Sequence, residues 1–267
     1  MNKVVVVTGA SAGIGKSICQ YLTKKGFIVY GLSRRKVNDE PFFNFQVDIT
    51  DVSSIDHAIE TIIENEGRID ILINNAGMGI SGSVENTPLE DARRLFDVNF
   101  FGAVQMIQRM IPHMRKNGNG KIINISSLAA NFPIPFQTFY SASKAAFSSF
   151  THALHNELKP FNISITAVLP GDIKTEFTKH REKNDYDDEA YGTRIKKSIE
   201  TMEKDEQNGM DPIVISKQVY KLICKKKMPI ESTVGVQYKT MLFIQRFVSK
   251  TFVNNILGLM YGFTKKK

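Results

Sequence analysis

Residues 3–15 read Lys-Val-Val-Val-Val-Thr-Gly-Ala-Ser-Ala-Gly-Ile-Gly. The four consecutive valines predict a short strand buried on both faces, because no polar residue alternates with them. The glycines that follow allow a tight turn and let backbone N–H groups approach a phosphate at the start of a helix. The segment therefore predicts a strand–turn–helix unit that can bind phosphate groups.

Apolar runs of the same kind alternate with helical patterns along the first 170 residues. Strands that are apolar throughout and separated by helices form a parallel sheet covered on both faces, so we predict a single α/β domain with a Rossmann-type, doubly wound sheet. The predicted strands are residues 4–7, 28–32, 43–47, 69–73, 121–125 and 164–168. The predicted helices between them are residues 13–25, 52–66, 89–116 and 138–158.

The remainder of the 267-residue chain divides into an insertion and an extension. We place the catalytic domain at residues 1–237, which includes a helix over 212–226 and a last strand near 232–236. Residues 172–208 are rich in charge and show little apolar periodicity, which indicates a mobile insertion that serves as a substrate lid. Residues 238–267 are predicted to form an amphipathic helical extension that packs beside this insertion and closes the pocket. Its apolar stripe is Met241, Ile244, Val248, Phe252, Ile256, Met260 and Phe263.

Composition is that of a globular protein, with 42% hydrophobic and 23% charged residues. The net charge of +8 raises nucleic acid and acidic lipid as partners, but the basic residues are dispersed and no nucleic-acid partner is predicted. Cys19 and Cys224 match no metal or redox spacing, which fits a reducing cytoplasm. Because the first strand begins at Lys3 and no apolar run reaches about 18 residues, we expect neither a signal peptide nor a membrane span.

The turn after the second predicted strand reads Ser33-Arg34-Arg35-Lys36, and no Asp or Glu lies between Gly15 and Asn38. Dinucleotide sites for NAD place an acid at this point to hold the ribose hydroxyls. Guanidinium groups instead favour a 2′-phosphate through charge-assisted hydrogen bonds, so NADP(H) is predicted over NAD(H). The alternative is that this turn is only a solvated basic loop.

Tyr140 and Lys144 are four residues apart and therefore share one face of a predicted helix. A neighbouring ammonium stabilises a phenolate and is expected to lower the pKa of the tyrosine from about 10. Such a hydroxyl can protonate a developing alkoxide or deprotonate an alcohol. Taken alone, however, this spacing is common on helix surfaces.

Further motifs occur in one order along residues 3–175. They are Thr8-Gly9 with Gly13-Ile14-Gly15, Asn74-Asn75-Ala76-Gly77, Asn99, Ser127, Tyr140 with Lys144, and Pro170-Gly171. Together they resemble the short-chain dehydrogenase/reductase superfamily. Residues 96–177 are nearest in character to hydroxysteroid and retinol dehydrogenases, notably through Phe161-x-Ile163 and Ile173-x-Thr175. One departure is Ala12, where many NADP-dependent members carry a basic residue.

The resemblance implies a catalytic set of Asn99, Ser127, Tyr140 and Lys144. Ser127 would bind the substrate oxygen, Lys144 would also bind the nicotinamide ribose, and Asn99 would hold a water that links Lys144 to solvent. Among the cofactor contacts, Asp48 would meet adenine and Asn75 the adenosine ribose, while Ile173 and Thr175 would meet the carboxamide. The full implied cofactor-binding set is Gly9, Ser11, Gly13, Ile14, Gly15, Ser33, Arg34, Arg35, Asp48, Asn75, Ala76, Gly77, Tyr140, Lys144, Pro170, Gly171, Ile173 and Thr175.

These features predict an NADP(H)-dependent oxidoreductase that interconverts a ketone or aldehyde and an alcohol by hydride transfer. Phe132, Phe136 and Phe139 lie between the serine and the tyrosine in a segment without charge, which favours an apolar, steroid-like carbonyl substrate. The alternative is that these rings simply pack inward. No metal is expected, because His152 and His155 lack an evident third ligand.

Other functions are also open at this point. A β-ketoacyl-thioester reductase would use the same catalytic groups. Two alternatives from other classes are a non-catalytic NADPH-binding regulator and a membrane-surface protein that uses the extension, membrane association being less favoured than packing on the domain. The resemblance further implies a homodimer or homotetramer.

Overall fold

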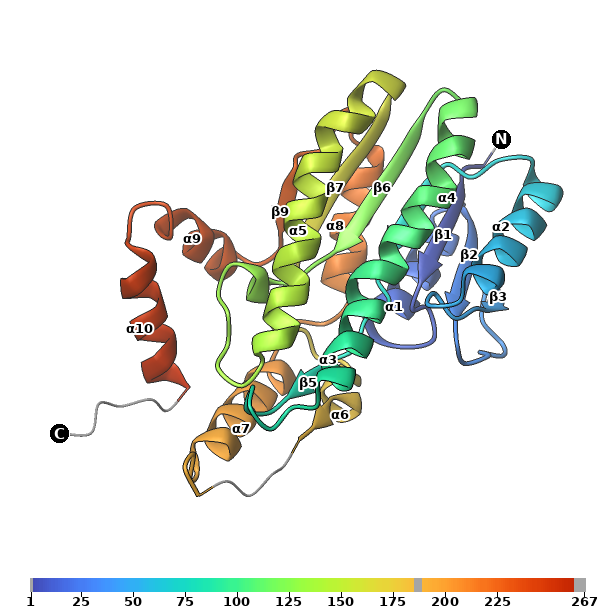
Figure 1. The fold of residues 1–267 in the computed structure, drawn as a ribbon. Helices are drawn as coiled ribbons and strands as arrows, with labels where there is room; N and C mark the ends of the chain where they lie inside the picture. The colour runs from blue at the N-terminus through green and yellow to red at the C-terminus, as the bar shows by residue number, and fades with distance from the viewer. Residues whose placement is uncertain (1, 185–188, 262–267) are drawn as a thin grey trace.

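A computed structural model describes residues 2–184 and 189–261. Its main sheet contains seven strands in the order β3-β2-β1-β4-β6-β7-β9, and every neighbouring pair is parallel (Figure 1). The strands are β1 Val4–Thr8, β2 Ile28–Ser33, β3 Phe43–Gln46, β4 Ile71–Asn74, β6 Gly120–Ile125, β7 Ile163–Leu169 and β9 Glu231–Thr233. The order reverses between β1 and β4, so the predicted doubly wound Rossmann-type fold is confirmed.

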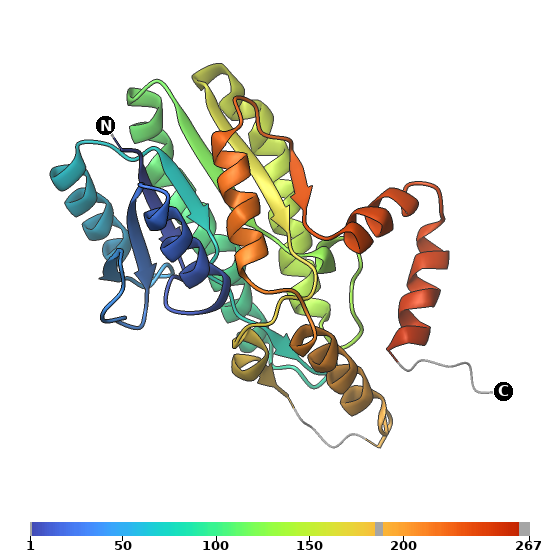
Figure 2. The same ribbon diagram turned by 180° about the vertical axis from the view of Figure 1, so that it is seen from behind.

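Helices cover both faces of the sheet, and each face has its own hydrophobic core. On one face α2 (Val52–Glu66), α4 (Gly102–Lys116) and α5 (Thr138–Leu158) pack on the strands (Figure 1). On the other face lie α1 (Gly13–Lys24) and α8 (Ile213–Cys224) (Figure 2). The central strands are buried on both sides, which explains why their sequences are apolar throughout.

The helix predicted over residues 89–116 is interrupted. It consists of α3 (Leu89–Phe96), a π-helical segment η1 (Asp97–Phe101) and α4. Asn99 lies in the π segment and is buried. A π segment inside a helix rotates its side chains out of the regular register and is often found at functional sites.

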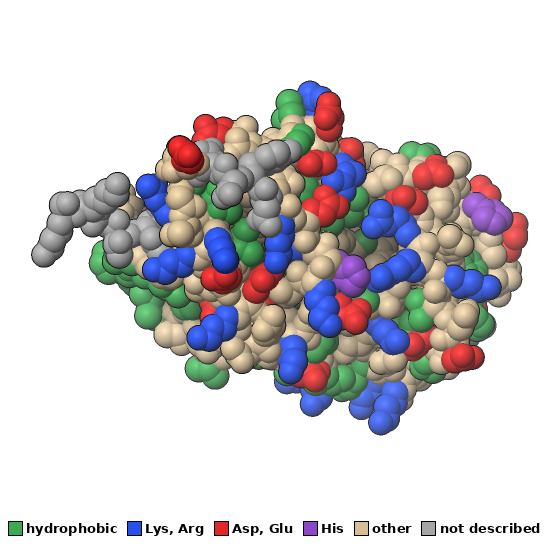
Figure 3. All heavy atoms as spheres, turned by 90° about the horizontal axis from the view of Figure 1, so that it is seen from below, with side chains coloured by type: hydrophobic (Ala, Val, Ile, Leu, Met, Phe, Trp, Pro, Cys, Tyr) green, Lys and Arg blue, Asp and Glu red, His purple; other side chains and the backbone are tan. Residues whose placement is uncertain are grey.

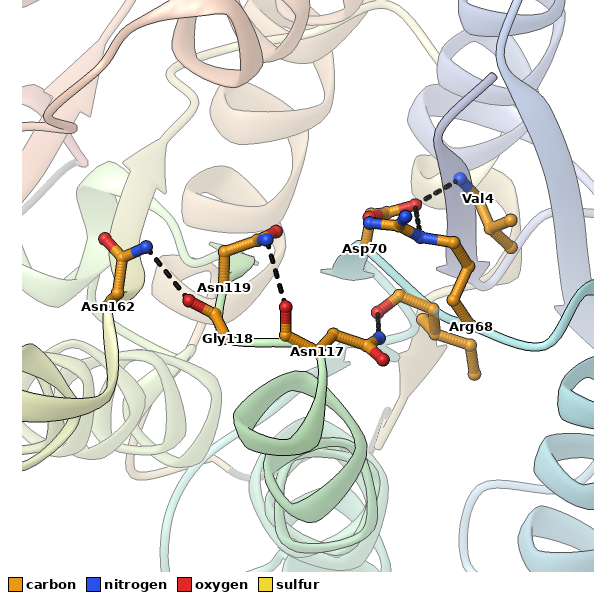
Figure 4. A network of polar contacts seen from close by, with 8 residues as sticks. Val4, Arg68, Asp70, Asn117, Gly118, Asn119 and Asn162 are labelled. Atoms are coloured by element: carbon orange, nitrogen blue, oxygen red, sulfur yellow. Dashed lines mark hydrogen bonds and ion pairs between the residues drawn. The ribbon is translucent and has the colours of Figure 1, made fainter. Parts of the chain in front are cut away.

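Polar side chains tie the amino ends of the strands together (Figure 4). Asp70 accepts a hydrogen bond from the backbone N–H of Val4 at 2.8 Å and pairs with Arg68. Asn162 donates to the carbonyl oxygen of Gly118 at 3.0 Å. These contacts hold together the amino ends of the strands, whereas the predicted site residues lie at the carboxyl ends.

The insertion at residues 172–208 is more regular than predicted. It contains α6 (Phe177–His180), β8 (Glu182–Lys183) and α7 (Arg194–Gln207), and β8 pairs in parallel with β5 (Ile80–Ser81). The expectation of little apolar periodicity is wrong for α7, because Ile195, Ile199 and Met202 recur at helical spacing and are buried. The lid role of the insertion stays a prediction.

The C-terminal extension forms two helices, α9 (Val236–Ile244) and α10 (Lys250–Met260). Tyr238, Leu257 and Tyr261 are its buried side chains, and they belong to a third hydrophobic core that also contains α7. In Figure 1 the two helices lie beyond the β9 edge of the sheet. In the described part of the chain, no helix is both long and apolar enough to cross a membrane.

The packing of the predicted apolar stripe differs from expectation. Its members Met241, Ile244, Phe252, Ile256 and Met260 are all exposed. Phe263 lies outside the described residues. The chain turns between α9 and α10, so a single helical stripe does not run along the extension, and a different set of side chains packs on the domain. The prediction that this stripe packs on the domain is therefore wrong.

Candidate active site

The predicted site residues converge on the carboxyl ends of the parallel strands. The glycine-rich turn follows β1, the basic turn follows β2, and Asn75 follows β4. Ser127 and Pro170 follow β6 and β7. In an open parallel sheet, ligands bind beyond this edge at the reversal of strand order, which here lies between β1 and β4.

The glycine-rich turn has the geometry that a phosphate requires. Gly9 and Gly13 have positive φ angles of 69° and 54°, which favour glycine. A Cβ atom at Gly15 would lie 2.3 Å from the carbonyl oxygen of Gly9, so a side chain is excluded there. Helix α1 begins after Ala12, whose methyl group cannot cap the first N–H groups of the helix. These N–H groups and the helix dipole fit the pyrophosphate of a dinucleotide.

The basic turn after β2 reaches the glycine-rich turn. Arg34, Arg35 and Lys36 are exposed, and Nη2 of Arg35 donates to Oγ of Ser11 at 3.3 Å. Ser33 is buried, and its hydroxyl donates to the carbonyl oxygen of Arg35 at 2.7 Å. The guanidinium group of Arg35 is thus directed to the phosphate end of the candidate site.

Two residues expected to contact the adenosine are engaged with the protein itself. The amide nitrogen of Asn75 donates to the carbonyl oxygens of Thr8 at 3.1 Å and Gly9 at 3.3 Å. Oδ1 of Asp48 accepts from the backbone N–H and the hydroxyl of Thr50. The structure therefore gives Asn75 a positioning role for the glycine-rich turn, and the adenosine contacts stay predictions.

Asn99, Lys144 and Gly77 meet at one point. Oδ1 of Asn99 accepts from the backbone N–H of Met78 at 2.8 Å, and its amide nitrogen donates to the Met78 carbonyl at 2.9 Å. Nζ of the buried Lys144 donates to the carbonyl oxygen of Ile125 at 3.1 Å. A Cβ atom at Gly77 would lie 3.2 Å from Oδ1 of Asn99 and 3.6 Å from Nζ of Lys144. The π segment and α5 thus bring the asparagine and the lysine together.

Tyr140 lies between Lys144 and Ser127. Nζ of Lys144 is 5.8 Å from the centroid of the Tyr140 ring, as the i, i+4 spacing predicts. The Ser127 side chain acts on the Tyr140 hydroxyl and lowers its pKa, and Oγ of Ser127 accepts from the backbone N–H of Ala129 at 3.1 Å. The structure therefore places all four predicted catalytic residues in one group.

The proton affinities in this group differ from the sequence expectation. Burial raises the pKa of Tyr140 above its ordinary value, against the opposing effects of the Ser127 hydrogen bond and the Arg181 charge. Burial also lowers the pKa of Lys144 to about 8. The expected lowering of the Tyr140 pKa is wrong for this structure, because burial outweighs the lowering effects of Ser127 and Arg181.

The loop after β7 completes the rim of the candidate site. The carbonyl oxygen of Pro170 accepts from the backbone N–H of Leu128 at 3.0 Å. A Cβ atom at Gly13 would lie 3.3 Å from Cβ of Thr175, so this loop faces the glycine-rich turn directly. Ile173 is buried in the core that α1 and α8 share.

Tyr238 of the extension reaches this loop, and sequence reasoning missed it. A Cβ atom at Gly171 would lie 2.3 Å from the Tyr238 ring. The Tyr238 hydroxyl donates to Oδ2 of Asp172 at 2.7 Å and accepts from the Asp172 backbone N–H at 3.0 Å. No local pattern indicates this contact, because the residues are 66 positions apart.

A buried ion pair beside Tyr140 was also missed. The Tyr140 ring centroid is 6.0 Å from that of Phe177, and the guanidinium carbon of Arg181 is 5.4 Å from the Phe177 ring. The Arg181 side chain is only 1% exposed and pairs with Glu206 of α7. The Arg181 charge lowers the pKa of Tyr140, and the Glu206 charge raises it. In the sequence, both residues look like ordinary solvated charges of the insertion.

The segment between Ser127 and Tyr140 packs largely inward. Phe132 and Phe136 are each 8% exposed and belong to the core formed with α7 and the extension. Phe139 is half-buried. The alternative of inward packing therefore holds for two of the three rings, and Phe177 is the aromatic side chain in contact with Tyr140.

The histidines of α5 bind protein groups. Nδ1 of His155 lies 3.0 Å from the carbonyl oxygen of Ile165, and Nε2 of His152 lies 2.8 Å from a carboxylate oxygen of Glu231. Within residues 2–184 and 189–261, no cluster of three or more His, Cys, Asp or Glu side chains could hold a metal ion.

The parallel sheet, its glycine-rich turn and the group of Ser127, Tyr140 and Lys144 are the arrangement expected of a nicotinamide-dependent oxidoreductase of the Rossmann type. A family model described as short chain dehydrogenase matches residues 3–186, and the chain belongs to this family. The protein is therefore an oxidoreductase that acts on carbonyl or alcohol groups, and its fold binds a nicotinamide cofactor.

Known relatives cover most of the chain. It is 41% identical over 236 residues to "3-ketodihydrosphingosine reductase" of Bacteroides thetaiotaomicron, covering 87% of this chain and 88% of that protein. It is 28% identical over 278 residues to "NADPH-dependent 3-dehydrocapnine reductase" of Ornithobacterium rhinotracheale, covering 96% and 98%. A short-chain dehydrogenase from Streptomyces avermitilis has a similar solved structure, with a TM-score of 0.84, 26% identity, and coverage of 99% and 100%.

Proposed function

We propose that this protein is an NADPH-dependent reductase of a lipophilic ketone. The observation that carries the proposal is the group in which Nζ of the buried Lys144 lies 5.8 Å from the Tyr140 ring centroid and the Ser127 side chain acts on the Tyr140 hydroxyl. A bound nicotinamide would supply or accept the hydride. Ser127 binds and orients the substrate oxygen, and Tyr140 exchanges the proton with that oxygen.

The proton affinities are compatible with the proton transfer that reduction requires. Because burial raises the pKa of Tyr140, its hydroxyl keeps its proton near neutral pH and is ready to donate it to an alkoxide. Lys144, with a pKa of about 8, exchanges protons near neutral pH and resupplies the tyrosine. Asn99 lies beside Lys144 at Gly77, where it would help to hold a water through which this proton arrives.

The preference for NADPH rests on the basic turn. Arg35 is directed to Ser11 of the glycine-rich turn, and the turn after β2 carries no carboxylate that would hold a ribose 2′-hydroxyl. Guanidinium groups bind a phosphate by charge-assisted hydrogen bonds, which supports a 2′-phosphate at this position. The relative from Ornithobacterium rhinotracheale is named as NADPH-dependent.

We propose a long-chain 3-keto compound of the sphingoid type as the substrate. Its support is the name of the relative from Bacteroides thetaiotaomicron, which is 41% identical over most of both chains. Phe177 beside Tyr140 provides an apolar contact for such a substrate.

A panel of carbonyl compounds tests the proposed function. Purified protein with NADPH is offered 3-ketodihydrosphingosine, a steroid ketone, retinal and an acetoacetyl thioester, and cofactor oxidation is followed by absorbance. We expect the sphingoid ketone to have the highest kcat/KM, and Tyr140→Phe to lose roughly 10²–10⁴-fold in kcat with NADPH binding nearly intact. A higher kcat/KM for the thioester would support the β-ketoacyl-thioester reductase instead. Near-native turnover by Tyr140→Phe would remove this residue from the mechanism.

A further inference from the structure

The extension gathers most of the exposed apolar side chains of this protein. Among the described residues, sixteen large apolar side chains are exposed, and nine of them lie within residues 236–260. These nine are Val236, Met241, Phe243, Ile244, Phe247, Phe252, Ile256, Leu259 and Met260. The other seven are scattered between residues 43 and 230. Figure 3 shows hydrophobic side chains gathered at the end of the molecule where the extension lies. Contiguous apolar surface of this kind marks an interaction site.

The same segment carries only positive charge. The last acidic residue of the chain is Glu231, whereas Lys239 and Lys250 are exposed on the two helices and Arg246 is exposed in the turn between them. The sequence continues to Lys265, Lys266 and Lys267. Over the rest of the face in Figure 3, basic and acidic side chains are interspersed. The exposed apolar side chains of the extension are therefore accompanied by positively charged side chains alone.

We propose that the surface formed by α9 and α10 binds an anionic membrane. Interfacial helices insert apolar side chains at the headgroup boundary and hold Lys and Arg near anionic lipids, and this surface has both properties. Because each helix is too short to span a bilayer, the extension lies on the membrane surface. A different set of side chains attaches the two helices to the domain, namely Tyr238, Leu257 and Tyr261.

A second copy of the chain fits this surface less well. In a twofold interface the same patch faces itself, so the three exposed cations of one copy would approach those of the other. Like charges brought together in an interface are unfavourable. An anionic lipid surface instead neutralises them, which is why we assign the surface to lipid.

The membrane surface is connected directly to the candidate active site. Tyr238 lies in α9, packs on Gly171 and hydrogen-bonds Asp172 in the loop after β7. If the substrate is the long-chain ketone of the proposed function, membrane binding by the extension places the candidate active site next to the lipid in which that ketone dissolves. This step rests on the proposed function, whereas membrane binding itself rests only on the surface.

Vesicle flotation of the full-length protein tests the assignment. The probes are phosphatidylcholine vesicles and vesicles that also contain phosphatidylglycerol. We expect wild type to float with the anionic vesicles and the partition coefficient to fall at least tenfold without anionic lipid. Lys239→Gln with Arg246→Gln and Lys250→Gln should lower binding about a hundredfold, since each cation contributes roughly fivefold near such a surface.

A pair of matched variants separates lipid binding from a general loss of apolar surface. Phe247→Ser with Phe252→Ser should abolish flotation, whereas Phe43→Ser with Leu89→Ser, which changes two exposed side chains elsewhere, should float like wild type. Absence of wild-type flotation would overturn the proposal, and so would equal effects of the two double variants. So would an oligomer in lipid-free buffer that only Phe247→Ser with Phe252→Ser dissociates, because the occupant would then be a second copy.

Turnover distinguishes this proposal from the proposed function. A short-chain, water-soluble ketone is assayed with wild type and with Phe247→Ser, Phe252→Ser, and we expect equal kcat/KM. With the long-chain ketone in anionic vesicles, the variant should lose at least tenfold in kcat/KM. Flotation without turnover on any carbonyl compound would contradict the proposed function and leave membrane binding supported.

Discussion

Replacement of Lys144 by methionine should stabilise the protein while it abolishes catalysis. Lys144 is buried in α5, and burial lowers its pKa from 10.5 to about 8. At about 1.36 kcal/mol for each pKa unit, the protonated amine is held in the folded protein at a cost of about 3 kcal/mol. The variant also loses the hydrogen bond to the Ile125 carbonyl, which reduces the gain in stability by roughly 1 kcal/mol. Methionine has a similar length and no charge, so we expect a net stabilisation of about 2 kcal/mol at neutral pH.

The stabilisation should depend on pH in a defined direction. The pKa of Lys144 is lower in the folded protein than in the unfolded chain, so the folded state binds fewer protons between about pH 8 and pH 10.5. The cost of the buried charge is therefore complete below about pH 8 and disappears as the pH rises to about 10.5. The advantage of Lys144→Met should shrink over the same interval.

Urea unfolding without cofactor measures both effects. The urea midpoint and the slope of the unfolding free energy against urea concentration are measured for wild type and Lys144→Met at about pH 7 and near pH 10. If the slope is unchanged, the free energies of unfolding can be compared directly. A variant that is less stable than wild type at neutral pH would refute the reasoning. A difference that does not change with pH would also refute it, because Lys144 would then not be the titrating group.

Three further changes test the candidate site and its surroundings. Ser33→Asp with Arg34→Ala introduces an acceptor for the ribose hydroxyls and removes a phosphate partner, so the kcat/KM for NADPH divided by that for NADH should fall. If wild type binds NADPH and NADH with equal Kd, the predicted preference for NADPH is wrong. Gly15→Ala places a methyl carbon 2.3 Å from a carbonyl oxygen of the glycine-rich turn, so cofactor binding measured by calorimetry should be lost. Glu206→Gln leaves the buried guanidinium of Arg181 without its carboxylate and should cost about 3 kcal/mol in urea unfolding, and a change below about 0.5 kcal/mol would show that the pair is dispensable.

The main elements could be predicted because their signals are local. The central strands are buried on both faces, so each appears as an uninterrupted apolar run, and the covering helices show their own periodicity. The strands β5 and β8 have two residues each and carry no such pattern. In α7 the buried Ile195 and Met202 are surrounded by charged residues, which concealed the periodicity.

The strand-end residues of the site follow from topology, because parallel strands bring their carboxyl ends to one edge. The spacing of Tyr140 and Lys144 likewise predicts their contact. It does not predict their pKa values, which depend on how completely the surrounding elements exclude water. Arg181 and Tyr238 could not be found, because each reaches the site through the packing of a segment that is distant in sequence.

The extension illustrates a different limit. Helical spacing indicates that an apolar stripe exists, but it does not say what covers the stripe. Here the turn after α9 changes the direction of the chain, and Tyr238, Leu257 and Tyr261 become the side chains that pack on the domain. Burial of these three leaves the other apolar face exposed beside cations alone. The extension, which has no acidic residue, therefore has two apolar faces. One face packs on the domain beside the candidate active site, and the other is the face that we propose binds lipid.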